Sequence, residues 1–241
     1  MNEKTGNILR TVAIVFFGLT AAMNILGGVG TTCAAFGFTR EYRIAFYELQ
    51  DFKWLYQILV VTTILIGLAG VWATIALAQG KQKAYRNGLI VLIIGTVLAG
   101  VQFIASMALR GEATPANVKF LANGLTLLVF LVIRLPAIWK YVDFSAPESP
   151  IDGATAGGLA AIVAGGVVLT VPSWAGSSHT YFGENWVNVL LAPLTLGGLF
   201  LIVVGIMLIS RQVIKAIQSS EPLLNRRQPV RNDANSRSLR K

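Results

Sequence analysis

The chain has few charged residues for its length, and this scarcity restricts the class of protein. Asp, Glu, Lys and Arg together make up 13% of its 241 residues, whereas soluble domains average about 25%. Because 54% of the residues are hydrophobic, a soluble fold of this size would lack a polar surface. The composition therefore favours an integral membrane protein, whose outer surface faces lipid.

Cysteine and histidine each occur only once, as Cys33 and His179. A single cysteine forms no disulfide within the chain and no CxxC motif. One histidine supplies neither the axial imidazoles of a haem between spans nor the several ligands of a zinc site. Ser177 and Ser178 precede this histidine, but they do not stand in a nucleophile elbow, and no carboxylate is placed to orient the imidazole. We therefore expect no cofactor, no metal and no catalytic residues, with Cys33 packed and His179 in a solvated loop.

Long apolar stretches are the main positive feature of the sequence. A hydrocarbon core of ~30 Å is crossed by roughly 20 helical residues, and charges and turn formers separate six stretches of about this length. They lie near residues 9–30, 55–79, 87–109, 118–139, 156–174 and 187–210. We predict an all-α fold, a polytopic integral membrane protein with a bundle of about six transmembrane helices within residues 1–220.

Acidic residues are missing from all six stretches, which counts against a proton-coupled pump. We take Arg134 as the only formal charge well inside a span. It lies five residues before Trp139, or ~7.5 Å along a helix, so its side chain can reach the interface or a carbonyl freed by Pro136. Contact with a ligand or a lipid phosphate is the alternative.

Amide side chains are the other polar groups within the spans. Asn24, Gln102 and Asn123 lie in three different stretches, and such groups usually bond to one another between membrane helices. The alternative is a polar route through the bundle, which Arg134 would share. Small residues at four-residue spacing, such as Gly157, Ala161 and Gly165, predict close helix packing, either within the chain or against a partner.

The distribution of Lys and Arg predicts the orientation of the spans. With the N-terminus inside, 15 of the 20 cations lie on the cytoplasmic side and five on the other, and eight of the 15 lie from Arg211 onward. The positive-inside rule then places the N- and C-termini in the cytoplasm. We expect an inner, or plasma, membrane as the location. Because the positive charge is concentrated in one tail, it does not indicate binding of nucleic acid.

Residues 221–241 form a basic tail, which we expect to be cytoplasmic. Arg226, Arg227 and Arg231 are the candidate contacts for anionic lipid or an acidic partner.

Three hypotheses on function remain from the sequence. The first is a non-catalytic integral membrane subunit that packs within a larger membrane protein complex, in contact with membrane lipids and other membrane protein subunits. The alternative is a small transporter or channel for a neutral or anionic solute, lined by Arg134, Asn123 and Gln102. A lipid-modifying enzyme is the third and least favoured, because Glu112 is expected on the opposite side from the other loop carboxylates.

Overall fold

The protein is an all-α bundle in the computed structural model, which describes residues 3–37, 40–142, 144, 150–176, 179–181 and 183–226. Among these residues, six helices are long and apolar enough to cross a membrane, which confirms the predicted fold class. They are α1 (Glu3–Phe36), α3 (Lys53–Ala78), α4 (Ala84–Arg110), α5 (Ala116–Ile133), α7 (Pro150–Ala175) and α8 (Leu191–Arg226).

The remaining elements are short and lie between the long helices. They are α2 (Arg40–Ala45), the 3-10 helix η1 (Tyr47–Phe52), α6 (Pro136–Trp139), strands β1 (Thr180–Tyr181) and β2 (Glu184–Asn185), and the 3-10 helix η3 (Trp186–Leu190). The two strands pair antiparallel, with Thr180 opposite Asn185. Residues 43–54, between the first two predicted spans, thus form the end of α2, the whole of η1 and the start of α3.

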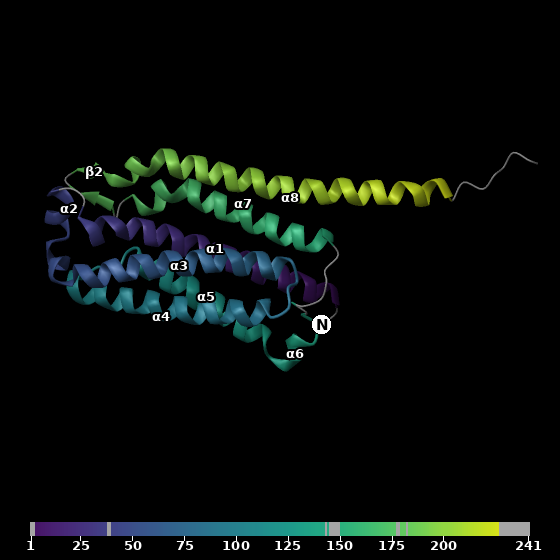
Figure 1. Ribbon diagram of the computed structural model, residues 1–241, viewed down its shortest axis with the longest axis horizontal. Helices are drawn as coiled ribbons and strands as arrows, with labels where there is room; N and C mark the ends of the chain where they lie inside the picture. The colour runs from purple at the N-terminus through teal and green to yellow at the C-terminus, as the bar shows by residue number, and fades with distance from the viewer. Residues whose placement is uncertain are drawn as a thin grey trace, which may run out of the picture.

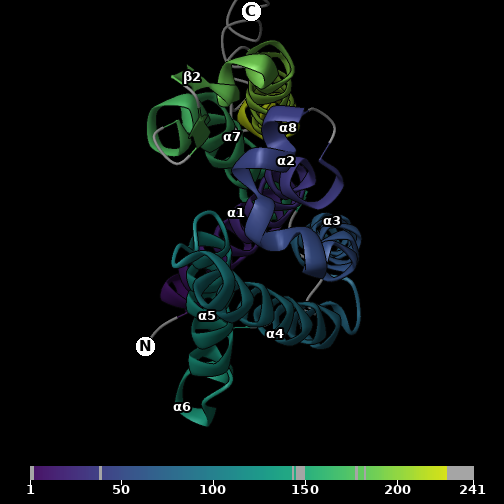
Figure 2. The same ribbon diagram turned by 90° about the vertical axis from the view of Figure 1, so that its left-hand side faces the viewer.

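Successive long helices run in opposite directions along one axis (Figure 1). We call the end that carries α2 the α2 end, and the opposite end, which carries α6, the α6 end. Helix α1 packs against α3, α5 and α7, and α4 packs against α3 and α5. An end-on view shows α1 between two groups, with α3, α4 and α5 on one side and α7 and α8 on the other (Figure 2). The centre of the molecule is therefore α1.

Local backbone chemistry explains where the fourth span ends. The predicted stretch 118–139 is divided in the structure into α5 and α6. Leu135 between them has φ −56° and ψ 134°, the extended conformation that proline imposes on the residue before it. The preceding helix, α4, ends for a different reason. The residue after its last one, Gly111, takes φ 68° and donates its N–H to the carbonyl of Met107, a conformation that commonly ends a helix.

The last helix continues beyond the predicted bundle. Helix α8 extends to Arg226, so the first residues of the predicted tail are helical. Arg227 and Arg231, the other two candidate docking residues, lie outside the described residues.

Glycines on α7 and α8 bring these two helices into backbone contact. A Cβ atom built at Gly165 would lie 2.6 Å from the carbonyl oxygen of Gly198, and one built at Gly158 would lie 2.8 Å from that of Gly205. The small-residue surface that begins the fifth span is thus used for packing within the chain. Helix α8 contacts α7 and η3, so its place in the bundle depends on these glycines.

Candidate functional site

A pair of amide side chains joins α1 to α5 in the interior. Asn24 Nδ2 donates to Asn123 Oδ1 over 3.1 Å, and Asn123 Nδ2 donates to Asn24 Oδ1 over 2.9 Å and to the carbonyl of Lys119 over 2.8 Å. One turn away, the hydroxyls of Thr20 and Thr126 lie 2.7 Å apart. Membrane helices are held together in this way, at about 0.6 kcal/mol per hydrogen bond.

A second set of bonds continues from this pair toward the α2 end and includes a buried cation. Lys119 Nζ donates to Gln102 Oε1 over 2.5 Å, Gln102 Nε2 donates to Thr31 Oγ1 over 3.1 Å, and Thr31 Oγ1 donates to the carbonyl of Gly27. Only 1% of the Lys119 surface is exposed. Gln102 lies eight residues from the end of α4, or about 12 Å, so this group is well inside the bundle.

The spacing of polar residues on α5 explains why the lysine is buried. The buried residues of this helix are Ala116, Lys119, Asn123, Thr126, Phe130 and Ile133. They recur every three or four residues and so share one face. The opposite face carries Leu121, Leu125 and Leu128, which are exposed. Since lipid disfavours polar groups, the polar face turns inward and takes Lys119 with it.

A cavity of about 360 Å³ lies at the α2 end, beside this lysine. Its wall is mostly apolar and includes residues of α1, α5, α7, η3 and α8. The polar residues of the wall include Thr31, Cys33, Tyr42, Tyr56, Gln102, Ser106, Arg110, Lys119 and His179. Among the described residues that line it, none is Asp or Glu. The cavity is therefore an apolar space with one buried ammonium group in its wall.

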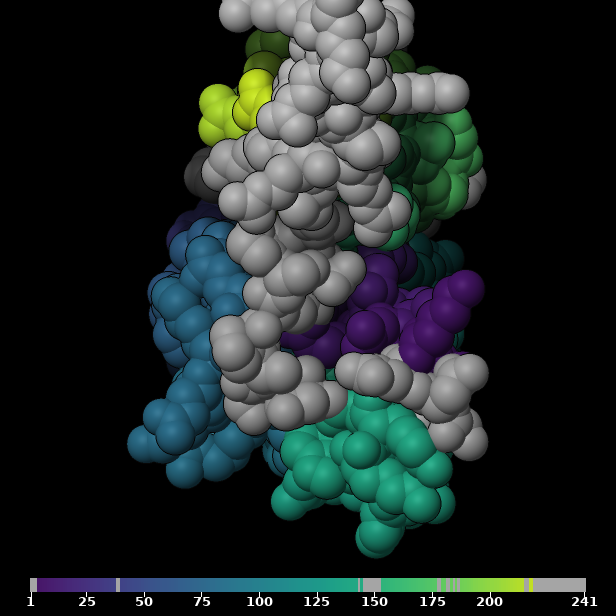
Figure 3. Space-filling model, turned by 90° about the vertical axis from the view of Figure 1, so that its right-hand side faces the viewer, coloured from purple at the N-terminus to yellow at the C-terminus, as the bar shows by residue number. Residues whose placement is uncertain are grey.

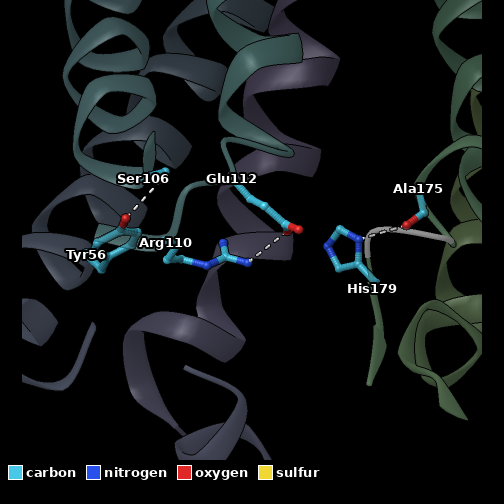
Figure 4. Close-up of polar contacts among 6 residues, drawn as sticks. All are labelled: Tyr56, Ser106, Arg110, Glu112, Ala175 and His179. Carbon is cyan, nitrogen blue, oxygen red and sulfur yellow. Dashed lines mark hydrogen bonds and ion pairs between the residues drawn. The ribbon is translucent and has the colours of Figure 1, made fainter. Parts of the chain in front are cut away.

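Other charged and aromatic groups lie around the cavity (Figure 4). Arg110 forms an ion pair with Glu112 over 3.8 Å, and its guanidinium lies 5.0 Å from the centre of the Phe46 ring. Across the cavity, His179 Nδ1 lies 2.9 Å from the carbonyl oxygen of Ala175. The positive charge of Arg110 is thus compensated within the chain.

Tyrosine hydroxyls complete the polar part of the wall. The hydroxyls of Tyr56 and Ser106 lie 2.9 Å apart (Figure 4). Burial raises the pKa of Tyr42, and its hydrogen bond with Cys33 raises the pKa further. Tyr42 therefore stays a neutral hydroxyl at physiological pH and brings no negative charge to the cavity.

Aromatic side chains fill the interior at the α6 end. The ring of Tyr85 packs on those of Phe130, Trp139 and Phe144, with centres 4.7–5.5 Å apart, and its hydroxyl donates to the carbonyl of Phe130. Phe17 packs on Phe130 from α1. Together with the Asn24–Asn123 and Thr20–Thr126 pairs, these rings separate the cavity from the α6 end.

Two arginines belong to the α6 end rather than to the cavity. Arg134 is exposed, and its guanidinium lies 4.4 Å from the ring centre of Trp139. Arg10 is 2% exposed and donates to the carbonyl of Leu77 over 2.8 Å. Figure 3, which looks onto this end, shows the start of α1 (purple) above the teal residues of α6.

The structure thus divides the residues singled out from the sequence into two groups. Asn24, Asn123 and Gln102 lie in one bonded network, and Gln102 also lines the cavity, whereas Arg134 lies at the opposite end. Lys119, the second residue of the predicted span 118–139, counted there among the five cations of the outer side, is the cation of the site. The signal that could have placed it is the spacing of Lys119, Asn123 and Thr126, four and three residues apart on one helix face.

Comparison with protein-family models, curated proteins and solved structures finds no match to this chain. Among the described residues, no group of three or more His, Cys, Asp or Glu side chains is placed to hold a metal ion.

Proposed function

We propose that this protein is a small, non-catalytic membrane carrier that binds an anionic solute at Lys119. The observation that carries the proposal is the burial of this ammonium group in the cavity wall, where its hydrogen-bond partner is the neutral amide of Gln102. A buried cation costs several kcal/mol unless an opposite charge compensates it. Since none of the described lining residues is acidic, a bound anion is the natural compensating charge.

The packing of the interior favours a carrier over an open channel. Between the cavity and the α6 end stand the Asn24–Asn123 pair and the aromatic rings around Tyr85. A channel needs a continuous polar route, whereas a carrier holds its solute in a closed site until the helices rearrange. Transport through this chain therefore requires movement of α5 against α1.

We propose the orientation expected from the charges, with the protein in the plasma (inner) membrane and the α6 end facing the cytoplasm. Lys81, Lys83, Arg86, Arg134 and Lys140 all lie at or near that end, and Arg40, Arg43, Lys53 and Arg110 at the other. In this orientation the cavity takes its solute from outside the cell.

The only cysteine of the chain lines the cavity and reports on its charge. We expect an anionic methanethiosulfonate, the 2-sulfonatoethyl reagent, to modify Cys33 about tenfold faster than the cationic 2-trimethylammonioethyl reagent, each rate taken relative to a free thiol. This ratio corresponds to ~1.4 kcal/mol. The preference disappears in Lys119→Met and persists in Arg134→Met. In right-side-out vesicles the impermeant reagents reach Cys33, and in inside-out vesicles they do not.

Equal rates for the two reagents in the wild type, or a preference that survives Lys119→Met, would contradict the proposal. Replacing a buried charge by an apolar side chain of similar length is often tolerated, so the variant is expected to fold. Thr32→Cys in a Cys33→Ser background repeats the measurement from a neighbouring position of the wall.

A second candidate function, the non-catalytic subunit of a larger membrane complex, has support from α8. In an apolar stretch of 18 residues within the membrane-crossing segment 187–214, 11% of the residues are buried, whereas in the corresponding stretches of the other five segments 28–44% are buried. Leu196 and Phe200 are 70% and 66% exposed on this helix. Lipid or a partner helix covers such a face, and Arg226, Arg227 and Arg231 would then add contacts with an acidic partner.

Native mass spectrometry after purification in mild detergent distinguishes the two candidates. An assembly of fixed stoichiometry that Phe200→Asp dissociates would support the subunit, and the matched variant Ile104→Asp, on the exposed face of α4, would leave it intact. A single chain with bound lipid would contradict the subunit and leave the carrier.

A further inference from the structure

We infer that the solute is an amphipathic monoanion, a single carboxylate head on a long apolar body. The inference rests on the proposed carrier function and names its substrate class. Three features of the cavity support it: the separation of polar and apolar residues in its wall, the charges of that wall, and its volume.

The polar and apolar parts of the wall come from different helices. Gln102 and Ser106 belong to α4, Lys119 to α5 and Tyr56 to α3, so the hydrogen-bonding groups gather on one side of α1 (Figure 2). The other side, from α7 onward, contributes mainly apolar residues: Val171, Trp174, Ala175, Val187, Val189, Leu190 and Leu194. A molecule that satisfies both sides has a polar head and an apolar body.

The charges of the wall specify a single negative charge on that head. Arg110 is already paired with Glu112, which leaves the ammonium of Lys119 as the cation that the solute meets. An ammonium carries three N–H donors, and one of them goes to Gln102 Oε1. The two oxygens of a carboxylate match the remaining donors, whereas a doubly charged phosphate monoester would leave one charge buried without compensation.

The volume of the cavity fits an organic molecule better than a small inorganic ion. Sites for small molecules commonly have ~300–1,000 Å³ and mostly apolar walls, and this cavity has about 360 Å³. A small hydrated anion gains nothing from the residues of α7, η3 and α8. Each additional methylene buried against them is expected to raise the affinity about fourfold.

The test measures protection of Cys33 from methyl methanethiosulfonate, a neutral reagent, in protein reconstituted into lipid nanodiscs. Octanoate, decanoate and dodecanoate are expected to protect with affinity that rises with chain length. Dodecanol, dodecyltrimethylammonium and dodecyl phosphate, added at equal concentration in the membrane, should each protect at least tenfold less well than dodecanoate. Lys119→Met removes this advantage of dodecanoate over dodecanol, and Arg134→Met keeps it.

A variant of the apolar wall tests the other half of the inference. Leu194→Trp, which fills space on the α8 side of the cavity, should weaken the binding of dodecanoate, while the preference of Cys33 for anionic thiol reagents persists. Equal protection by dodecanol, or stronger protection by dodecyl phosphate, overturns the carboxylate head. Protection by nitrate or sulfate alone overturns the amphipathic solute but leaves the anion carrier. Absence of both anion protection and reagent preference overturns the carrier itself.

Discussion

Gly165→Ala and Gly198→Ala are each expected to lower the unfolding temperature of the detergent-solubilised protein by roughly 2–12 °C, whereas Gly166→Ala and Gly197→Ala are expected to leave it unchanged or to raise it. An oversized side chain in a packed interface costs ~1–3 kcal/mol, and each kcal/mol lowers the unfolding temperature of a chain of this size by ~2–4 °C.

Gly165 and Gly166 are adjacent in sequence, and so are Gly197 and Gly198, but the two glycines of each adjacent pair meet different surroundings. A Cβ at Gly165 would lie 2.6 Å from the backbone oxygen of Gly198, and one at Gly198 would lie 2.9 Å from the backbone oxygen of Gly165. Nothing lies within 4 Å of a Cβ at Gly166 or Gly197. Because backbone atoms cannot rotate away as a side chain can, Gly165→Ala and Gly198→Ala push α7 and α8 apart. Gly166→Ala and Gly197→Ala only improve helix propensity, by ~0.5–1 kcal/mol.

The measurement is the fraction of monodisperse protein that remains after heating, followed by size-exclusion chromatography. The double variant Gly165→Ala/Gly198→Ala should lose less than the sum of the single losses, because the first methyl group already separates the helices at that point. Equal stability of Gly165→Ala and Gly166→Ala would mean that α7 and α8 do not meet at these glycines.

The class of the fold follows from composition and length, and for this reason it could be predicted without a structure. A helix that satisfies all its own backbone hydrogen bonds is one of the few ways to cross a bilayer, so six apolar stretches of sufficient length specify six helices. Their bounds were less predictable. Pro136 lies within an apolar stretch, and hydropathy alone did not reveal that it divides 118–139 into α5 and α6.

The site was predictable in part for a similar reason. Polar amides within spans bond to other helices, and Asn24, Asn123 and Gln102 do so. Arg134 follows a long run of apolar residues in the sequence, yet it lies at the α6 end, with its guanidinium 4.4 Å from the ring centre of Trp139. Lys119 counts as a cation of the outer side in the sequence because it stands at the start of the predicted span 118–139, three residues into α5.

Distance from the end of a helix does not measure burial in a bundle whose helices have different lengths. Helix α5 has 18 residues, whereas α1 has 34. The ends of α1 and α4 therefore extend past the start of α5 and enclose Lys119. Such an offset depends on how helices distant in sequence align, and a hydropathy profile contains no information on it. The cavity has the same origin, since its wall combines residues of α1, α4, α5, α7 and η3.

Gly27→Ala is the substitution expected to affect the site most without changing any charge. The stem of Lys119 crosses Gly27, and a Cβ there would lie 2.8 Å from Cγ and 2.9 Å from Cε of the lysine. Because the stem is buried, it can yield only by turning away, which breaks the bond from Nζ to Gln102. We expect a loss of ~1–3 kcal/mol of stability together with loss of the preference of Cys33 for the anionic thiol reagent.

Two further variants separate the lost position of the ammonium from a general loss of packing. Gly30 lies one turn further along α1, and a Cβ there would be 3.7 Å from Nε2 of His179, which is an ordinary contact. Gly30→Ala should therefore keep the stability and the anion preference of the wild type. In Gly27→Ala/Lys119→Ala the shortened side chain makes room for the methyl group, so thermal stability returns while the anion preference stays lost. If Gly27→Ala alone kept the full preference, the position of the ammonium would not depend on the glycine beneath it.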